Sequence, residues 1–409
     1  MKLKQIDRRL VTILLIVFVQ MLGASMALPI LPLFAQRTFA LSPQTIALLV
    51  SSFFAAQFLA GPSIGRLSDK YGRVPVLIVS QIGTAISFVL LGAAQSAIML
   101  FIARILDGIT GGNIIAAQAY VTDITPREKR TQSLGYIFAA FGLGFIFGPV
   151  MGGALSAVFG PRVPFYVAAA AAMLVTLLTH FTLDESLTAE QRLANRKSRS
   201  SSLDPTIIVR NIPLLFILLI AFVGQFGLGL LQSTFALYAQ AVLFVGESRE
   251  YTDLGVGLLL AFVGLSQFFT QTFLLPRILP RFGEAILVIA GNALRALGSF
   301  IFALVTSMWI APLGSIAFAM GMGIVVPSLQ SLSTNTVDDE VRGGVLGLFQ
   351  STINLSTIFS TAVAGAIFNI GPTMPYWVGG VLTTAVIPLA VILYRQSLKP
   401  KAALSTTAD

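Results

Sequence analysis

The sequence predicts an all-α membrane protein of twelve transmembrane helices, arranged as two six-helix halves with both termini in the cytoplasm. Three observations predict this class. Hydrophobic residues make up 56% of the chain and charged residues only 11%, whereas soluble domains carry roughly 25% charged residues. Apolar runs of about 20 residues, the length that spans a bilayer, recur throughout the chain. Two stretches of the first half also reappear in the second half.

Each apolar run is predicted to form one spanning helix, because only short polar connections separate most of the runs. The runs lie near residues 11–35, 45–64, 74–96, 98–122, 133–158, 163–183, 212–240, 254–275, 284–306, 308–330, 343–369 and 376–395. The first run is too long for the apolar core of a signal peptide and lacks a small-x-small cleavage site. We therefore expect it to remain as the first helix.

The basic residues indicate the orientation in the membrane. The net charge is +9, and the cations gather at both termini and in alternate connections. Membrane proteins concentrate Lys and Arg in cytoplasmic loops. This distribution predicts a lipid bilayer as the surroundings and argues against a nucleic-acid-binding surface. A single histidine, His180, and the absence of cysteine leave no evident metal site.

The longest polar stretch, 184–211, is predicted to be a cytoplasmic linker between a six-helix bundle at 1–183 and a second at 212–409. The halves resemble each other in register. Residues 18–36 align without gaps to 222–240, and the sequence GRLSDKYG at 65–72 has a degenerate copy, PRILPRFG, at 276–283. A parallel repeat of this kind predicts a binding site near the middle of the membrane, between the halves.

The stretch GRLSDKYGR at 65–73 is predicted to be a short cytoplasmic loop. Gly65 and Gly72 suit a tight turn, and Asp69 and Arg73 keep the segment out of the hydrocarbon. The stretch resembles the signature of the major facilitator superfamily between its second and third helices. This resemblance implies the fold of that superfamily, the transport of a small molecule and, for family members generally, action as a monomer.

Asp123, at the end of the fourth run, matches the family's acid that partners the last arginine of the signature. The resemblance thus implies a cytoplasmic gate in which Asp69, Arg73 and Asp123 cluster. Asp69 would also face the N-terminal dipole of the helix at 343–369 and latch the outward-open state. Ordinary loop salt bridges without switching are the alternative.

Arg104 and Asp107 are charged residues within the fourth run. They lie three residues apart on one helical face, so they can pair. Charges inside a span normally face protein or water, so two interpretations stand: a buried pair that fixes packing, or an acid that titrates during transport. The stretch RILDGITGG resembles a family motif whose arginine is implicated in proton transfer. In Arg295, a second intramembrane cation, we expect a structural or snorkelling role.

The fifth run contains GLGFIFGPVMGG. Gly144, Gly148 and Gly152 recur every four residues, which suits close helix packing. Pro149 predicts a bend, and Gly153 broadens the bare face. A generic packing face would use the same spacing, but the full string resembles the antiporter signature of drug:proton exporters, where it acts as a hinge.

The resemblance is closest to the tetracycline-exporter-like drug:proton antiporters. Gln20 and Ser87 stand where those exporters carry acids, so tetracycline is not inferred as the substrate. Amides on helices that line the central cavity in this family predict contact with a largely apolar solute, although buried amides also serve as packing contacts. The predicted cavity residues are Gln20, Gln57, Asn113, Gln225, Gln232, Gln267, Gln271, Gln350 and Asn354.

The leading hypothesis is therefore export of a lipophilic small molecule or drug in exchange for protons, across a bacterial inner membrane and without a cofactor. The alternative is a proton-coupled uptake symporter or facilitator for a sugar or small metabolite, which predicts fewer glycines in the fifth run. A membrane-embedded enzyme or a sensor is a third class. The sequence offers no nucleophile and base set for an enzyme, and the tails are short for a sensor domain.

Overall fold

The computed structural model describes residues 8–111, 113–126, 130–187, 211–337 and 341–397. Within these residues all regular structure is helical and no strand occurs, which confirms the all-α prediction. Ten helical segments of this part are long and apolar enough to cross a membrane. The predicted twelve differ because one predicted span is broken in two and two others are joined in one segment, Arg249–Leu304.

The chain divides into two compact units. Unit 1 comprises Met1–Ser200, Gln232–Leu265 and Thr361–Pro372, and unit 2 comprises Ser201–Leu231, Ser266–Ser360 and Thr373–Asp409. Unit 1 thus contains segments from both predicted halves of the sequence. The division at a linker over 184–211 stays a prediction, and most of that stretch lies outside the described residues.

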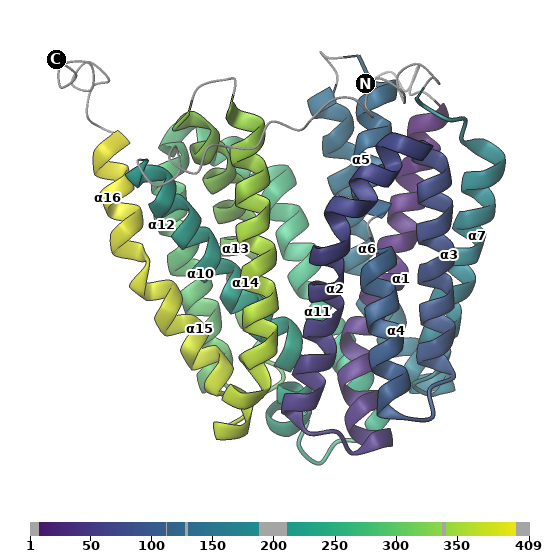
Figure 1. The fold of residues 1–409 in the computed structure, drawn as a ribbon. Coiled ribbons are helices and arrows are strands. Elements are labelled where there is room, and N and C mark those ends of the chain that lie inside the picture. Colours follow the sequence, from purple (N-terminus) through teal and green to yellow (C-terminus); the bar gives the residue numbers. More distant parts are fainter. Residues whose placement is uncertain (1–7, 112, 127–129, 188–210, 338–340, 398–409) are drawn as a thin grey trace. The chain divides into compact units, whose positions relative to one another are not determined.

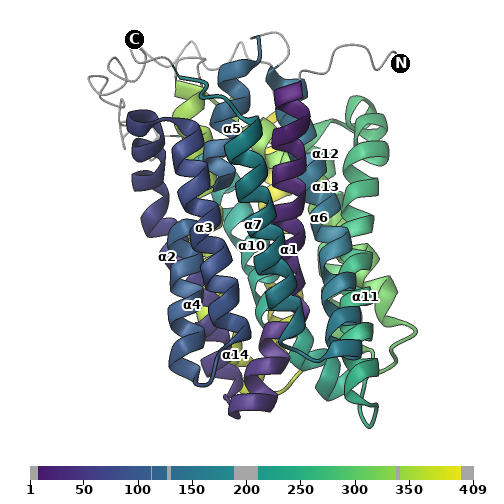
Figure 2. The same ribbon diagram turned by 90° about the vertical axis from the view of Figure 1, so that its right-hand side faces the viewer.

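Unit 1 is built on seven helices from the first part of the chain (Figures 1 and 2). They are α1 (Arg8–Phe39), α2 (Pro43–Tyr71), α3 (Arg73–Gly92), α4 (Ala97–Thr110), α5 (Asn113–Ile124), α6 (Arg130–Phe159) and α7 (Val163–Thr182). Helix α1 packs against α6 and α7, and α3 packs against α7. Apolar side chains that meet here are fully buried, among them Ile13, Leu77 and Tyr120. Their burial supplies the main stabilising contact of this bundle.

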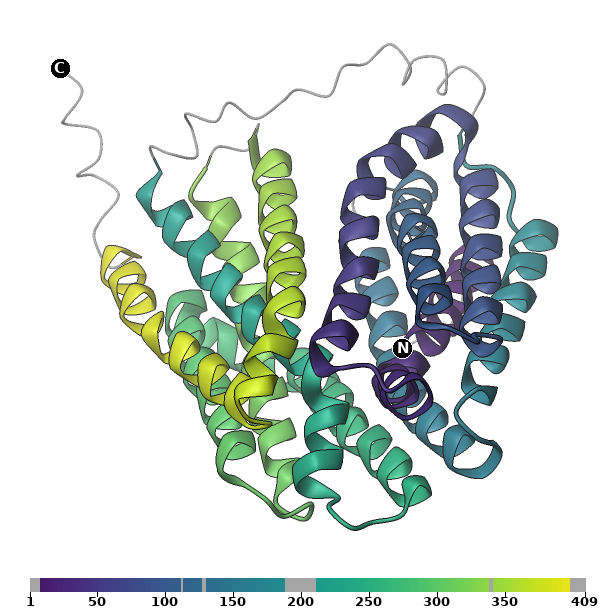
Figure 3. The ribbon, with the colours of Figure 1, turned by 60° about the horizontal axis from the view of Figure 1, so that its bottom comes forward.

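Unit 1 also contains the end of α10 (Ile212–Tyr238), the π-helix η2 (Ala239–Leu243), most of α11 (Arg249–Phe269) and the last turns of α14 (Arg342–Ile370). Unit 2 contains the rest of α10 and α14, the π-helix η3 (Thr270–Leu274), α12 (Leu275–Leu304), α13 (Ala311–Asn335), α15 (Met374–Ala385) and α16 (Ile387–Ser397). Helix α12 packs on α13 and α15. The core of unit 2 includes Leu214, Val345 and Ala390, from α10, α14 and α16. The yellow end of the chain forms the consecutive helices α15 and α16 (Figure 3).

The predicted loop at 65–73 is wrong in extent. Helix α2 continues through Tyr71, and only Gly72 separates it from α3. The segment is rich in Arg, Leu and Lys, which are good helix formers, and Asp69 and Arg73 pair at i,i+4. Gly65 therefore lies in a helix, where a Cβ would meet nothing within 4 Å.

The degenerate copy at 276–283 behaves in the same way. Gly283 is the one non-helical residue inside α12, with φ 73° and ψ 164°, close to the φ of 111° and ψ of 160° at Gly72. This region of backbone space is essentially reserved for glycine. The two copies thus share a glycine turn, which supports the repeat that the sequence indicates.

Candidate transport site

The structure brings together the three charged residues predicted for the gate. Arg73, 9% exposed, places Nη1 2.7 Å from Oδ1 of Asp69 and Nε 3.0 Å from Oδ2 of Asp123. Its Nη1 also donates to the hydroxyl of Ser68 at 3.1 Å. One guanidinium therefore joins α2, α3 and α5 at the Gly72 turn. The contact of Asp69 with the N-terminus of α14, and the switching role of the cluster, stay predictions.

Glu185 is part of this cluster, and sequence reasoning missed it. Its Oε1 accepts the backbone N–H of Arg73 at 2.9 Å and its Oε2 accepts that of Val74 at 3.1 Å. A carboxylate is favoured there, because the first N–H groups of a helix lack intrahelical partners and carry positive partial charge. A Cβ on Gly72 would collide with this carboxylate. The sequence placed Glu185 in a solvated linker, and no local signal connects it to a helix start more than 110 residues earlier.

Arg104 and Asp107 form the predicted pair, with Nη1 2.9 Å from Oδ2 and side-chain exposures of 11% and 8%. The Arg104 guanidinium lies over the ring of Phe53 on α2, 4.1 Å from its centroid. Helix α4 approaches α2 closely here, since a Cβ on Gly108 would lie 2.8 Å from the Cβ of Ala56. The pair therefore sits between packed helices, where a charge without its partner is costly.

The fourth predicted span is not continuous, which corrects the prediction of one helix over 98–122. Helix α4 ends at Thr110 and α5 begins at Asn113. Glycine is a poor helix former, and the amide of Gln57 donates to the carbonyl of Gly111 at the break, at 3.2 Å. Gln57, in the middle of α2, thus binds the C-terminal end of α4 inside unit 1. The side chain of Asn113 lies outside the described part of the structure.

The glycine face of α6 packs directly on α1. A Cβ on Gly144 would lie 2.5 Å from the Cβ of Met21, and one on Gly152 would lie 2.5 Å from the carbonyl oxygen of Met26. At Gly148 a Cβ would collide with the hydroxyl of Ser25, which donates to the Gly144 carbonyl at 2.9 Å. These positions admit no side chain without displacing α1.

The same stretch of α6 also contacts α11. A Cβ on Gly153 would lie 2.5 Å from the carbonyl oxygen of Asp253, and one on Gly257 would collide with the carbonyl oxygen of Pro149. Pro149 is accommodated inside α6, which continues to Phe159. Each of the five predicted hinge residues is thus at, or next to, a contact with α1 or α11. Whether α6 acts as a hinge stays a prediction.

The predicted cavity amides are distributed over both units. In unit 2, Gln225 donates to the hydroxyl of Thr357 at 3.0 Å, and Gln350 donates to Asn354 at 3.2 Å. Gln20 is buried, Gln232 and Gln267 are half-buried, and Gln271 is exposed. The π-helix η3 begins between Gln267 and Gln271, so the four-residue spacing of an α-helix does not apply to that pair.

Arg295 is buried in unit 2, with 2% of its surface exposed, which rules out snorkelling and leaves the structural role. Its Nη2 donates to the carbonyl of Gly224 on α10, and its guanidinium lies 5.4 Å from the ring centroid of Phe318. Cβ atoms on Gly224 and Gly321 would each lie within about 2.6 Å of this side chain. The arginine therefore fills the space between α10, α12 and α13.

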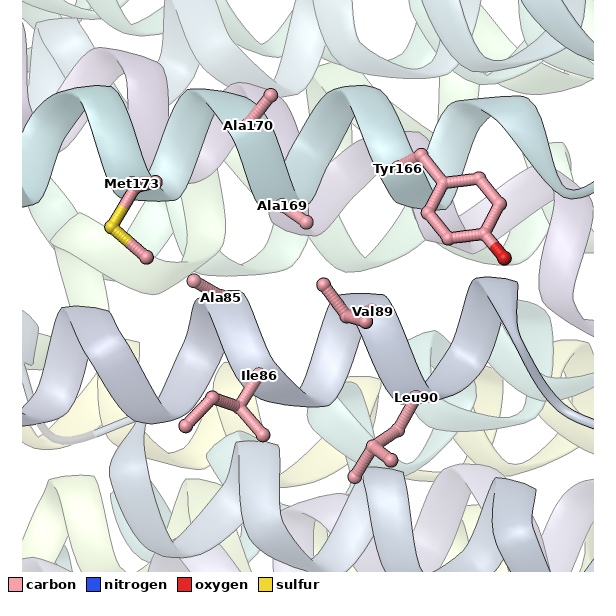
Figure 4. A pocket seen from close by; sticks show the side chains of 8 residues that line it. All are labelled: Ala85, Ile86, Val89, Leu90, Tyr166, Ala169, Ala170 and Met173. Atoms are coloured by element: carbon pink, nitrogen blue, oxygen red, sulfur yellow. The ribbon is translucent and has the colours of Figure 1, made fainter.

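An apolar cavity of about 370 Å³ lies between α3 and α7 of unit 1 (Figure 4). Small side chains, Ala85, Ala169 and Ala170, open the space, and Val89 and Tyr166 border it. None of the predicted site residues lines it. The cavity is consequently a feature of the helix surface rather than of the charged or amide sites described above.

Comparison with known proteins places this chain in a family. The model of the Major Facilitator Superfamily matches residues 13–246 and 233–409. The class C tetracycline resistance protein of Escherichia coli is 32% identical over 375 residues, covering 88% of this chain and 90% of that protein. The chain belongs to the major facilitator superfamily. The resemblance predicted from the residues at 65–73 is thus confirmed.

Two further comparisons extend this assignment. Multidrug resistance protein 2 of Bacillus subtilis (strain 168) is 26% identical, covering 95% of this chain and 96% of that protein. The crystal structure of the human organic anion transporter MFSD10 (TETRAN) has a TM-score of 0.68 at 22% identity, covering 94% of this chain and 99% of that chain. The protein is therefore a multi-pass membrane transporter of the major facilitator fold, similar to bacterial drug-resistance transporters. Members of this family are transporters rather than enzymes.

Proposed function

We propose that this transporter exports a lipophilic small molecule in exchange for protons, by alternating access across a bacterial inner membrane. It acts as a monomer, with twelve helices in two six-helix halves and both termini in the cytoplasm. The observation that carries the proposal is the double contact of α6, whose glycines pack on α1 while Gly153 and Pro149 meet α11. The similar relatives named for tetracycline and multidrug resistance support export over uptake.

The substrate class follows from which residues are uncharged. Gln20 is 8% exposed and Ser87 is fully buried. The hydroxyl of Ser87 donates to the carbonyls of Gly83 and Thr84 on its own helix, at 2.9 and 3.0 Å. These two positions offer no carboxylate for a cationic drug–metal complex. A polar but uncharged lining suits a lipophilic solute, which enters the protein mainly by leaving water.

Asp107 is the proposed coupling acid, and Arg104 is its counter-charge. In the structure, Nη1 of Arg104 and Oδ2 of Asp107 are 2.9 Å apart. A state in which the Arg104 side chain turns away from Asp107 leaves a buried carboxylate, which takes up a proton because the neutral form is cheaper to bury. The membrane potential supplies about 2.3 kcal/mol per charge per 100 mV, so one proton exchanged for one solute sustains a useful gradient.

The cluster of Asp69, Arg73 and Asp123 is the proposed cytoplasmic gate. Individual exposed ion pairs are weak, but Arg73 is 9% exposed and holds both acids. A small difference in its pairing between two states is sufficient to bias an equilibrium between them. Glu185 would contribute by fixing the start of α3, which carries Arg73.

The test is a proton-flux assay in proteoliposomes with an inside-acid pH gradient and an internal pH dye. Lipophilic dyes and antibiotics are added to wild type, to Asp107→Asn and to a matched surface variant, Asp184→Asn. Asp184 pairs with Arg9 in an ion pair whose side chains are 46% and 79% exposed, so its loss should not change flux. A compound that dissipates the gradient with wild type and Asp184→Asn, but not with Asp107→Asn, supports antiport through Asp107.

The remaining outcomes separate the parts of the proposal. An equal response of wild type and Asp107→Asn keeps antiport and removes Asp107 as the coupling acid. If only a sugar or another metabolite moves protons, and the protons enter the vesicle together with it so that the lumen becomes more acidic, the export proposal is overturned in favour of uptake.

A further inference from the structure

A second buried ion pair lies at the end of unit 1 opposite the Gly72 turn. Helices α1 and α2 follow one another in opposite directions, so the last turn of α1, which carries Arg37, is far from the last turn of α2. Nη1 of Arg37 donates to Oδ1 of Asp253 on α11 at 2.7 Å. The side chain of Asp253 is only 2% exposed and that of Arg37 is 21% exposed.

Both oxygens of this carboxylate are engaged. The hydroxyl of Ser156 on α6 donates to Oδ2 of Asp253 at 2.6 Å. Nε of Arg37 donates to Oε1 of Gln240 in η2 at 2.9 Å, and the amide of Gln240 donates to Gln36 at 3.1 Å. The network therefore connects α1 and α6, from the first part of the sequence, to η2 and α11, from the second. The exposed charged neighbours on α11 itself are Arg249 and Glu250.

Further contacts close the same end of unit 1. Helix α11 lies against α6 (Figure 2), with Gly153 in contact with the carbonyl of Asp253. The amide of Gln44, in the first turn of α2, donates to the carbonyl of Ala362 near the end of α14, at 3.0 Å. A Cβ on Gly365 would collide with the backbone of Gln44. At this end of unit 1, therefore, α6 contacts α11 and α2 contacts α14 in the same structure.

Among the acids that the structure describes, Asp107 and Asp253 are the buried ones, 5% and 1% exposed. They differ in where their cations lie. Asp107 pairs with Arg104 on its own helix, so the two move together. Asp253 pairs with Arg37 on another helix, so any separation of α1 from α11 leaves Asp253 without its cation. A carboxylate without its partner inside a membrane protein is costly, and a proton removes that cost.

We propose that Asp253 is a second proton-binding acid and that, with Arg37 and Ser156, it forms a latch that keeps this end of the transport path closed until it is protonated. The inference rests on the proposed function for the identity of the driving ion. The proton neutralises the carboxylate, and Arg37 keeps its charge but loses its anionic acceptor. By linkage, an open state in which Arg37 and Ser156 have left Asp253 is stabilised by acid.

The experiment is a distance measurement between α2 and α14 at the latched end. The chain has no cysteine, so nitroxide labels at Leu48→Cys and Val363→Cys react without background. Both positions are exposed, at 43% and 40%, and lie within one turn of the Gln44–Ala362 contact. Pulsed electron paramagnetic resonance on the full chain in nanodiscs then gives the closed and open populations between about pH 8 and about pH 5.

We expect the ratio of open to closed molecules to rise about tenfold as the pH falls, within the usual range of coupling between two sites. Asp253→Asn and Arg37→Gln should each show the raised ratio at every pH. The double variant Arg37→Asp/Asp253→Arg exchanges the two charges and keeps the ion pair, so it should restore the closed population that the single variants lose. Asp184→Asn, at an exposed ion pair, should match wild type.

A pH-dependent distance distribution in Asp253→Asn equal to that of wild type overturns the proposal. A wild-type distribution that does not change with pH, in a preparation that exchanges drug for protons, overturns it as well. If the distances respond to pH and to Asp253→Asn but transport is not proton-driven, the latch holds and the proposed function fails.

Discussion

Alanine substitutions at Gly65, Gly72 and Gly283 can separate two contributions of Gly72 to the free energy of unfolding. One is its backbone conformation, and the other is the space that it leaves for the Glu185 side chain. Gly72 and Gly283 share a backbone conformation that costs other residues about 1–3 kcal/mol. A Cβ on Gly283 meets nothing within 4 Å, whereas one on Gly72 collides with Glu185. Gly65 is helical and its surroundings are open, so alanine there should stabilise the helix by about 0.5–1 kcal/mol.

The expected order of stability is therefore Gly65→Ala at or above wild type, then Gly283→Ala, then Gly72→Ala. Gly283→Ala should lose about 1–3 kcal/mol of unfolding free energy through its backbone alone. Gly72→Ala should lose about 1.5–3 kcal/mol more, because displacing the Glu185 carboxylate breaks a charge-assisted hydrogen bond to the start of α3. Titration of the purified protein with SDS in mixed micelles, followed by circular dichroism, gives the unfolding free energies.

A double variant checks the cause. In a Glu185→Ala background the carboxylate that caps α3 is already lost and the new Cβ has no side chain to displace, so Gly72→Ala should cost only as much as Gly283→Ala. Equal losses for Gly72→Ala and Gly283→Ala in the otherwise wild-type chain would refute the role assigned to Glu185. A tolerated alanine at both positions would refute the backbone argument itself.

Three further outcomes are expected in the same titration. Arg104→Gln should cost about 3–5 kcal/mol by leaving Asp107 buried without its cation, and Arg104→Gln/Asp107→Asn should recover much of it. Gly148→Ala should cost about 1–3 kcal/mol, because its Cβ displaces Ser25, and should slow dye efflux from proteoliposomes. Arg295→Met should keep wild-type stability or exceed it, since it removes a buried charge at similar volume, whereas Arg295→Ala should lose about 2–5 kcal/mol to a cavity.

Sequence patterns predicted what depends on neighbours along one helix. The apolar runs located the helices, and the three-residue spacing of Arg104 and Asp107 located a pair that the structure contains. The loop predicted at 65–73 was wrong because helix propensity carries α2 through its charged end, and the single span predicted at 98–122 was wrong because the chain breaks at Gly111. Charge and hydropathy describe where a segment prefers to lie, but not where a helix stops.

Contacts between distant segments were not predictable from these patterns. Glu185 reads as the start of a polar linker, and Arg37 and Asp253 read as ordinary residues at the ends of apolar runs. Each acquires its role from a partner on another helix. An acid at the edge of a span is a weak signal, because most such acids are solvated. Only the fold shows that Asp253 is buried among α1, α6 and α11.

The two copies of the glycine turn show how a repeat diverges while its backbone is kept. Gly72 is followed by Arg73 and Gly283 by Glu284, so the copies carry opposite charges at the matching position. Arg73 holds two acids from neighbouring helices, whereas Glu284 accepts a hydrogen bond from the hydroxyl of Ser331 at 3.0 Å. The glycine is kept in both copies because the backbone conformation of the turn requires it. Among the described residues the multi-partner charge cluster occurs only at the first turn, which is why we assign the gate to that turn and not to its copy.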